Sequence, residues 1–131
     1  MYMLDTNICI YIIKKKPQKV LDQLKKNKGK GLYISAITLA ELEFGNENSL
    51  YKEKNKIALM EFLTIINIVH FDEKSAKEFG AIKKYLNDKN NIIGPYDMLI
   101  AAHTKSLNMT LVTNNTKEFK RIKELKIENW I

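Results

Sequence analysis

MYMLDTN, residues 1–7, places an acid and two polar residues directly after a short apolar run. The run at residues 1–4 predicts a strand, and the apolar residues 8–13 predict a buried helix. Asp5 is therefore expected at the carboxyl end of a strand, the edge of an open α/β sheet where ligands bind. A second interpretation is that Asp5 or Thr6 only caps the helix, because Asp and Thr are both favoured there.

The rest of the chain alternates short strands with helices. Further strands are predicted at residues 32–34, 67–71, 109–113 and 126–130. Helices are predicted at residues 19–28, 36–45 (ending at Gly45), 51–66, 72–90 and 95–108, and a short one is capped by Thr116. This order predicts an α/β fold, a three-layer sandwich whose mostly parallel sheet of four to five strands is flanked by helices. Without linkers or repeats, residues 1–131 are expected to form a single domain.

The composition is basic and poor in cysteine. A formal net charge of +7 attracts polyanions such as nucleic acid, although Arg121 is the only arginine and drift toward A/T-rich codons would produce a similar excess of lysine. Cys9 is the single cysteine and suits a reducing cytoplasm. His70 and His103 each lack metal-ligating neighbours, so both are expected to be packing or surface groups. No apolar stretch approaches the roughly 20 residues that cross a bilayer, so no membrane association is expected.

Glu41 is an acid on a helix that is apolar nearly all round. At about 100° per residue, one stripe of this helix is formed by Ile37, Ala40 and Phe44. Glu41 lies closer to the centre of that stripe than Glu43 does, and a carboxylate on an apolar stripe needs a partner. The alternative is a capping box between Thr38 and Glu41, which would require the helix to begin after Thr38.

Asp97 is expected in the first turn of a helix that begins at Pro95. An acid there stabilises the helix by about 0.3–1 kcal/mol through its interaction with the helix dipole, and this requires no functional role. However, Asp97 shares a stripe of small side chains with Ala101 and Thr104, which leaves room beside its carboxylate. Both a structural and a functional interpretation therefore remain open for this acid.

These acids are expected to meet at one edge of the sheet. If the strands that precede Asp5 and Asn115 are neighbours at the topological switch point, the two residues face each other across its crevice. Glu41 and Asp97 come from helices that could flank this crevice. Carboxylates and an amide form an all-oxygen site, which suits Mg²⁺ or Mn²⁺ and not Zn²⁺. Without an ion, the acids would repel one another and their pKa values would rise.

Four motifs in this order resemble the PIN-domain ribonucleases of the VapC toxin family. They are LDTN within residues 3–7, TLAELEFG at 38–45, IGPYDMLIAAH at 93–103 and LVTNNTKEF at 111–119. The resemblance extends to the closing IENW at 127–130 and covers essentially the whole chain. Each motif is weak by itself, but four at suitable spacing form a specific signal.

The resemblance implies a metal-dependent active site. Asp5, Glu41 and Asp97 correspond to its catalytic, metal-binding acids, with Mg²⁺ as the cofactor and Mn²⁺ as a substitute. The fourth catalytic position falls on Asn115, where many relatives carry Asp, and Glu118 is the alternative for that position. The residues implied to support the ligands or to contact the substrate are Thr6, Asn7, Thr113 and Glu118.

The resemblance also implies an activity and partners. The expected reaction is hydrolysis of phosphodiester bonds in structured cellular RNA, often tRNA, by a toxin that a VapB-type antitoxin neutralises by covering the site. A homodimer is expected as well, in line with the apolar surface of the helices between residues 37 and 66. Two alternatives are a non-catalytic basic module that binds RNA or protein, and a haloacid-dehalogenase-like phosphatase. The second alternative requires a D-x-D motif, in which Asn7 replaces the second acid.

Overall fold

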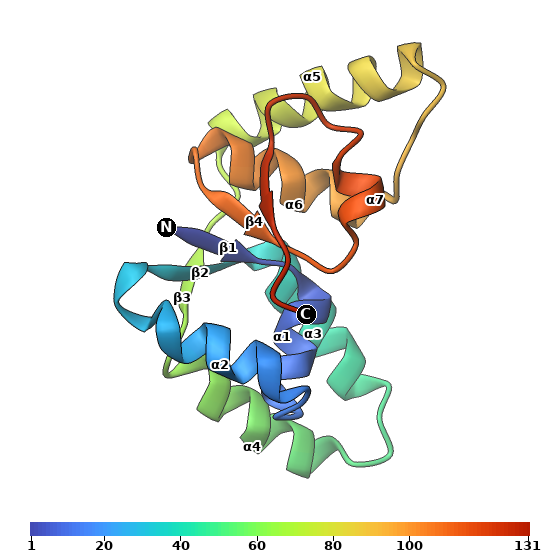
Figure 1. The fold of residues 1–131 in the computed structure, drawn as a ribbon. Coiled ribbons are helices and arrows are strands. Elements are labelled where there is room, and N and C mark those ends of the chain that lie inside the picture. Colours follow the sequence, from blue (N-terminus) through green and yellow to red (C-terminus); the bar gives the residue numbers. More distant parts are fainter.

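Five parallel strands form the centre of the computed structural model, which describes residues 1–131 (Figure 1). They are β1 (Tyr2–Leu4), β2 (Leu32–Ser35), β3 (Asn67–Val69), β4 (Thr110–Val112) and β5 (Lys126–Glu128). Their order is β3-β2-β1-β4-β5, and every neighbouring pair is parallel. Because β1 pairs with both β2 and β4, the strand order reverses beside β1. This confirms the expected topological switch point between the strands that precede Asp5 and Asn115.

Helices cover both faces of this sheet. They are α1 (Thr6–Ile13), α2 (Gln18–Lys26), α3 (Ala36–Glu47), α4 (Lys52–Leu63), α5 (Glu73–Asp88), α6 (Pro95–Ser106) and α7 (Thr116–Phe119), with a 3₁₀ turn, η1, at Lys28–Lys30. The first four helices lie on one side of the sheet, and α5, α6 and α7 lie on the other (Figure 1). The expected three-layer sandwich is therefore confirmed. None of the helices combines the length and apolar character that a membrane span requires.

Alternation along the strands divides the core into two halves. Met3 on β1 is in register with Leu111 on β4, and both pack under α5 and α6. The next residue, Leu4, is in register with Val112 and packs under α1 to α4. Successive side chains of a strand point to opposite faces, so each strand supplies both halves. This packing holds the carboxyl ends of β1 and β4 side by side.

Several helix boundaries are set by local side chains, as expected. Asp5 caps α1 by accepting a hydrogen bond from the Ile8 N–H at 2.9 Å. Ser35 caps α3 in the same way, and Asp72 caps α5. Pro95 is the first residue of α6. These starts could be predicted because each depends on a donor and an acceptor within one turn.

Two predicted boundaries are wrong. The helix expected to stop at Gly45 continues to Glu47, because Gly45 keeps a helical conformation and does not adopt the positive φ of a terminating glycine. Thr116 is the first residue of α7 and not its cap. Asn115 occupies the cap position, but its side-chain oxygen makes no capping bond, and its side-chain nitrogen donates to Glu118.

The predicted packing stripe of α3 is also wrong. Phe44 is 70% exposed and Ala40 is exposed, whereas the buried side chains of this helix are Thr38 and Leu42. The helix carries apolar residues on several faces, so periodicity could not identify the one that meets the sheet. The inward position of Glu41 nevertheless holds, because Glu41 follows the buried Thr38 by three residues and is half-buried.

Candidate functional site

Asp5 lies at the carboxyl end of β1, where the chain turns into α1. Its side chain is only 4% exposed, and it caps the helix with one oxygen. Burial raises the pKa of the Asp5 carboxyl, whereas hydrogen bonds from the Thr113 hydroxyl and the Ile8 N–H lower it. The nearby Glu41 carboxylate adds to the rise in pKa. The capping interpretation of Asp5 is thus confirmed, and the same residue also lies within electrostatic reach of another acid.

Glu41 is held in place by the first residue of α1. The Thr6 hydroxyl donates a hydrogen bond to Glu41 Oε1 at 2.6 Å, and it also lies 3.3 Å from the hydroxyl of Thr38. The capping-box alternative is excluded, because Ser35 starts α3 and Glu41 bonds to a different helix. Thr6 therefore orients the carboxylate of Glu41 toward the end of β1, as a residue that supports the site would.

Asp97 has the most strongly perturbed carboxyl of the group. Burial raises its pKa to about 6, and repulsion from Asp5, Glu118 and Glu41 adds to the rise. Four acids from α6, the start of α1, α7 and α3 therefore share one electrostatic environment. Acids gathered at a sheet edge, with the pKa values of Asp5 and Asp97 raised, are a typical sign of a functional site.

Asn115 and Glu118 form one hydrogen-bonded unit at the start of α7. The Asn115 side chain donates to Glu118 Oε2 at 2.7 Å, while its backbone N–H donates to the Thr113 hydroxyl at 2.9 Å. Glu118 is thereby held where it raises the pKa of Asp97. Asn115 retains its carbonyl oxygen as a free acceptor, so the structure places both candidates for the fourth position together.

The remaining predicted residues differ in what they contribute. Thr113 is fully buried between Asp5 and Asn115 and bonds to both sides. The exposed side chain of Asn7 makes no hydrogen bond within the protein, and Asn7 acts on the site through its backbone N–H, which lowers the pKa of Asp5. The structure thus brings Thr113 into the cluster and leaves the side chain of Asn7 at its rim.

The donor set fits a hard divalent cation. It consists of carboxylate, hydroxyl and amide oxygens, which Mg²⁺ and Mn²⁺ prefer. As the side chains stand, no three Asp, Glu, His or Cys groups are close enough together to enclose an ion. Mg²⁺ is usually bound by one or two carboxylates with waters and substrate phosphates, so a preformed cage is not required. Burial is the main cause of the raised pKa values of Asp5 and Asp97, and repulsion between the acids, which a bound cation would relieve, adds to it.

The cysteine and the two histidines are not arranged as ligands of this site. Cys9 is fully buried, and burial raises the pKa of its thiol well above the usual range, so it is inert. His103 is buried against Ser35 and Phe71, and His70 is exposed. The expectation that neither histidine belongs to a metal cluster is consistent with this arrangement.

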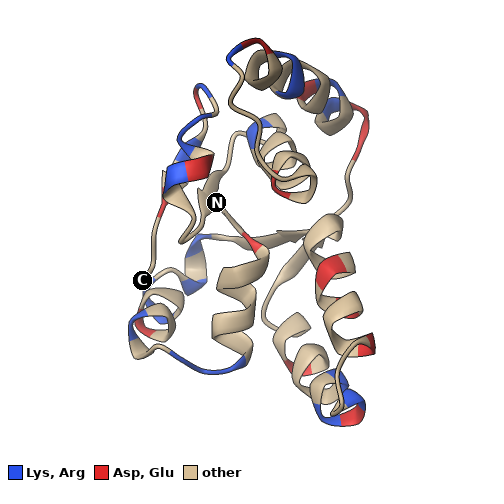
Figure 2. Ribbon diagram, turned by 90° about the vertical axis from the view of Figure 1, so that its right-hand side faces the viewer, with Lys and Arg blue, Asp and Glu red and all other residues tan.

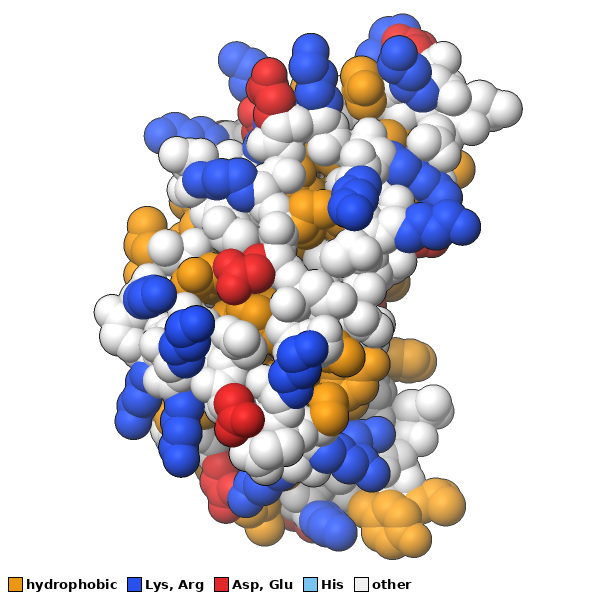
Figure 3. Space-filling view, in the orientation of Figure 1, with side chains coloured by type: hydrophobic (Ala, Val, Ile, Leu, Met, Phe, Trp, Pro, Cys, Tyr) orange, Lys and Arg blue, Asp and Glu red, His pale blue; other side chains and the backbone are white.

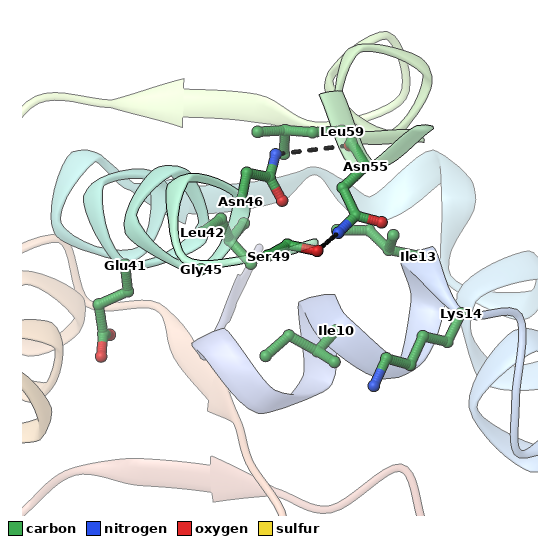
Figure 4. A pocket seen from close by; sticks show the side chains of 10 residues that line it. All are labelled: Ile10, Ile13, Lys14, Glu41, Leu42, Gly45, Asn46, Ser49, Asn55 and Leu59. Atoms are coloured by element: carbon green, nitrogen blue, oxygen red, sulfur yellow. Dashed lines mark hydrogen bonds between the residues drawn. The ribbon is translucent and has the colours of Figure 1, made fainter. Parts of the chain in front are cut away.

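A cavity of about 280 Å³ lies between α1, α3 and α4 (Figure 4). Its apolar walls are Ile10, Ile13, Leu42 and Leu59, and its polar lining is Lys14, Glu41, Asn46, Ser49 and Asn55. The Asn55 side chain donates to the Ser49 hydroxyl at 2.8 Å, which fixes the α3–α4 connection (Figure 4). Glu41 is the one residue of the acid cluster that also lines this cavity.

Basic residues are spread over several elements of the molecule. Figure 2 shows Lys and Arg on α2, on the connection after α1, on α5 and near α7. On the face shown in Figure 3, lysines are scattered among apolar and uncharged groups. Such a distribution attracts a polyanion through the net positive charge of the whole protein. The acids at the end of the sheet carry the opposite charge.

Similarity to known proteins extends over the whole chain. The sequence matches the PIN domain family over residues 2–125. It is 44% identical to "Ribonuclease VapC2" of Haemophilus influenzae over 130 residues, which are 99% of this chain and 98% of that protein. It is 40% identical to the "tRNA(fMet)-specific endonuclease VapC" of Shigella flexneri over 129 residues, 98% of this chain and 97% of that one.

Solved structures agree with the sequence comparison. The fold superposes on a chain from the crystal structure of VapBC2 from Rickettsia felis bound to a DNA fragment from its promoter, with a TM-score of 0.95 and 44% identity. The match covers 99% of this chain and 98% of that one. The similarities agree with the four motifs and leave no support for the dehalogenase-like alternative.

Proposed function

The chain belongs to the PIN domain family and, within it, to the VapC ribonucleases, and from this premise we propose that it is an endoribonuclease toxin that a VapB-type antitoxin neutralises. The observation that carries the proposal is the meeting of Asp5, Glu41 and Asp97 at the switch point of the sheet. A non-catalytic module would have no need for this group of mutually repelling acids, and the relatives are named as nucleases.

We propose that Asp5 and Asp97 hold Mg²⁺, or Mn²⁺ in its place, and that Glu41 supports the same site. When bound, such an ion lowers the pKa of its water and offsets charge on the leaving oxygen of a phosphodiester. Thr6 keeps the Glu41 carboxylate aimed at the site, and Thr113 stabilises the ionised form of Asp5. Asn115 offers a neutral carbonyl oxygen beside Glu118, so the free protein is expected to hold one ion weakly.

We propose structured RNA, such as tRNA, as the substrate. The Shigella flexneri relative is named for cleavage of tRNA(fMet), and the net charge of +7 on this chain would draw in a folded polyanion. Lys14, which lines the cavity beside Glu41, is one basic residue that could contact the RNA backbone. Since tRNA is a cytoplasmic RNA, we place the protein in the cytoplasm.

We also propose that the cavity beside Glu41 receives part of the antitoxin. Its apolar walls suit a buried aliphatic or aromatic side chain, and Lys14 at its edge suits an acidic group. A segment seated there would reach the acid cluster through Glu41 and block access of RNA.

We propose that the chain forms a homodimer through exposed apolar residues. The exposed apolar side chains of the α3–α4 region are Phe44, Leu50, Tyr51, Ile57 and Met60. Surfaces of this kind on soluble proteins usually mark protein contacts. Replacing Ile57 and Met60 with lysine is expected to convert a dimer into a monomer in light scattering, whereas lysine at Ile92, an exposed residue in the loop between α5 and α6, is not. A wild-type monomer would contradict the assignment.

The central experiment combines metal removal with a matched pair of variants. Wild-type protein is expected to cleave a tRNA pool in Mg²⁺ and to stop in excess chelator. Asp5→Asn should be inactive in both conditions but folded, because Asn is as good a helix cap as Asp. Asp72→Asn is the control, since Asp72 caps α5 in the same way without belonging to the site. Full activity in chelator, or in Asp5→Asn, would refute the metal mechanism.

A further inference from the structure

A buried serine and histidine tie the start of α3 to α6. Ser35 ends β2 and caps α3, and its hydroxyl oxygen accepts a hydrogen bond from the Ile37 N–H at 3.0 Å. The same oxygen lies 2.7 Å from Nδ1 of His103, which comes from the third turn of α6. Ser35 and His103 are both fully buried, so neither can exchange its partner for water. The pair therefore links the helix that carries Glu41 to the helix that carries Asp97.

The direction of this hydrogen bond follows from the available partners. The Ser35 oxygen already accepts from Ile37, and the only other polar atom bonded to it is Nδ1 of His103. No other acceptor for the serine proton is found, so we assign that proton to Nδ1 of His103, which places the ring proton on Nε2. Burial lowers the pKa of His103 although the Asp72 carboxylate and the backbone of His70 oppose this, so the neutral ring is favoured. A hydroxyl that donates is a stronger acceptor, and the contact with His103 strengthens the cap of α3.

Two further features hold the imidazole in one orientation. The ring of Phe71 packs edge-to-face against it, with centroids 5.4 Å apart and an interplanar angle of 74°. Nε2 is buried and makes no hydrogen bond of normal geometry within the protein. An apolar side chain at this position would avoid burying a nitrogen that lacks a hydrogen bond of normal geometry, so the histidine is not explained by packing alone.

We propose that His103 is a positioning residue for the nuclease site, which acts through Ser35 to set the spacing between Glu41 on α3 and Asp97 on α6. Glu41 follows Ser35 by six residues, less than two helical turns, so a shift at the cap is carried to the carboxylate by a rigid helix. The effect on catalysis rests on the proposed function, whereas the hydrogen bond itself can be measured independently of it.

Two substitutions of His103, by asparagine and by glutamine, distinguish an effect on positioning from a general loss of stability. Asparagine places an amide oxygen near the position of Nδ1, whereas glutamine places it near that of Nε2. His103→Asn is expected to keep kcat within about threefold of wild type, and His103→Gln to lower kcat about tenfold or more, since small misplacements of catalytic groups are costly. The KM for RNA should stay unchanged in both, because His103 is buried away from the substrate. Equal kcat values for the two variants would refute the link.

Ser75 supplies a matched control for Ser35. It is also a fully buried serine beside α6, with its oxygen 3.1 Å from that of Ser106, but it ties α6 to α5, which carries no acid of the site. Ser35→Ala and Ser75→Ala should both lower the Tm, and only Ser35→Ala should lower kcat. If kcat falls equally in both, general destabilisation accounts for the effect and the positioning role is wrong.

Nuclear magnetic resonance tests the hydrogen bond without any RNA. At pH 7 the ¹⁵N shifts of His103 should show an unprotonated Nδ1 and a protonated Nε2, and the Ile37 amide should exchange with solvent faster in His103→Gln than in wild type. A protonated Nδ1, or unchanged exchange of the Ile37 amide, would overturn the proposal. Wild-type protein that cleaves no RNA would instead refute the proposed function while these spectra retained their meaning.

Discussion

Helices α3 and α6 each deliver one acid to the same site, but they are held by different forces. In α6 the side chains from Ile100 to Thr104 are all buried, so packing on several sides fixes the helix and Asp97 with it. In α3 only Thr38 and Leu42 are buried, and much of the helix is exposed. Glu41 is instead fixed by the hydrogen bond from Thr6. An acid on a well-packed helix needs no hydrogen bond of its own to hold it in place, whereas an acid on an exposed helix does.

The largest expected loss of RNA cleavage comes from replacing the acid on the well-packed helix, α6. Asp97→Asn should reduce RNA cleavage by more than about a hundredfold, because even residues that only support a metal ligand are worth 10–100-fold. The variant should remain folded, since packing and not the carboxylate holds α6. Initial rates on tRNA, with the fold checked by circular dichroism, measure this. Activity within tenfold of wild type would exclude Asp97 from the chemistry.

The same variant has a predictable effect on stability. The folded-state pKa of Asp97, about 6, lies above the ordinary value of 3.8, so the folded protein loses stability as pH rises between these values. Asp97→Asn removes that loss. Because Asp97 is only half-buried, the shift is discounted for solvent screening, and the gain is about 1 kcal/mol above pH 6. Urea unfolding at pH 7 and at pH 4 should show the gain only at pH 7, and equal gains at both would assign it to another cause.

A smaller loss of cleavage is expected when the hydrogen bond that holds the acid of the exposed helix, α3, is removed. Thr6→Val keeps the shape of residue 6 but removes the 2.6 Å hydrogen bond to Glu41, and cleavage should fall about 10–100-fold. Thr64→Val is the control, because Thr64 makes an equally short hydrogen bond, to the Glu61 carbonyl, outside the site. Parallel rate measurements on both variants test the difference. Unchanged cleavage by Thr6→Val would mean that packing alone suffices on α3 as well.

The smallest expected effect is a change in metal affinity after a substitution at the start of α7. Asn115→Asp adds a carboxylate next to Glu118, so Mn²⁺ should bind the free protein several-fold more tightly, since an opposite charge nearby is attractive and the ion relieves repulsion. Without an ion the added repulsion should lower the Tm. Calorimetric titration of both proteins measures the affinity. Equal or weaker binding by the variant would place Asn115 outside the metal site.

Features that depend on neighbours in sequence were predicted well. Strand β1 followed by Asp5, and Pro95 followed by Asp97, were located because strand composition, caps and first-turn preferences act within a few residues. The α/β class followed from the alternation of elements, and the parallel sheet from the crossovers this alternation requires. The site acids were named from the four motifs, and the structure brings them to one edge.

Features that depend on distant partners were not predictable. Phe44 was expected to pack inward but is exposed, because α3 has apolar residues on more than one face and only the sheet decides which is buried. The role of Thr116 was misjudged because Asn115 bonds to Glu118 instead of capping α7. His103 was expected to be a packing or surface group, and nothing near it in sequence pointed to Ser35.

The sequence by itself determined the order of elements, the family and the acids that we propose for its chemistry, because these reside in local patterns and short motifs. Only the tertiary structure decided how those acids are held. The hydrogen bond from Thr6 to Glu41 joins residues 35 apart, and the one between Ser35 and His103 joins residues 68 apart. Such contacts exist only after the strands have paired and the helices have packed, so no local pattern records them.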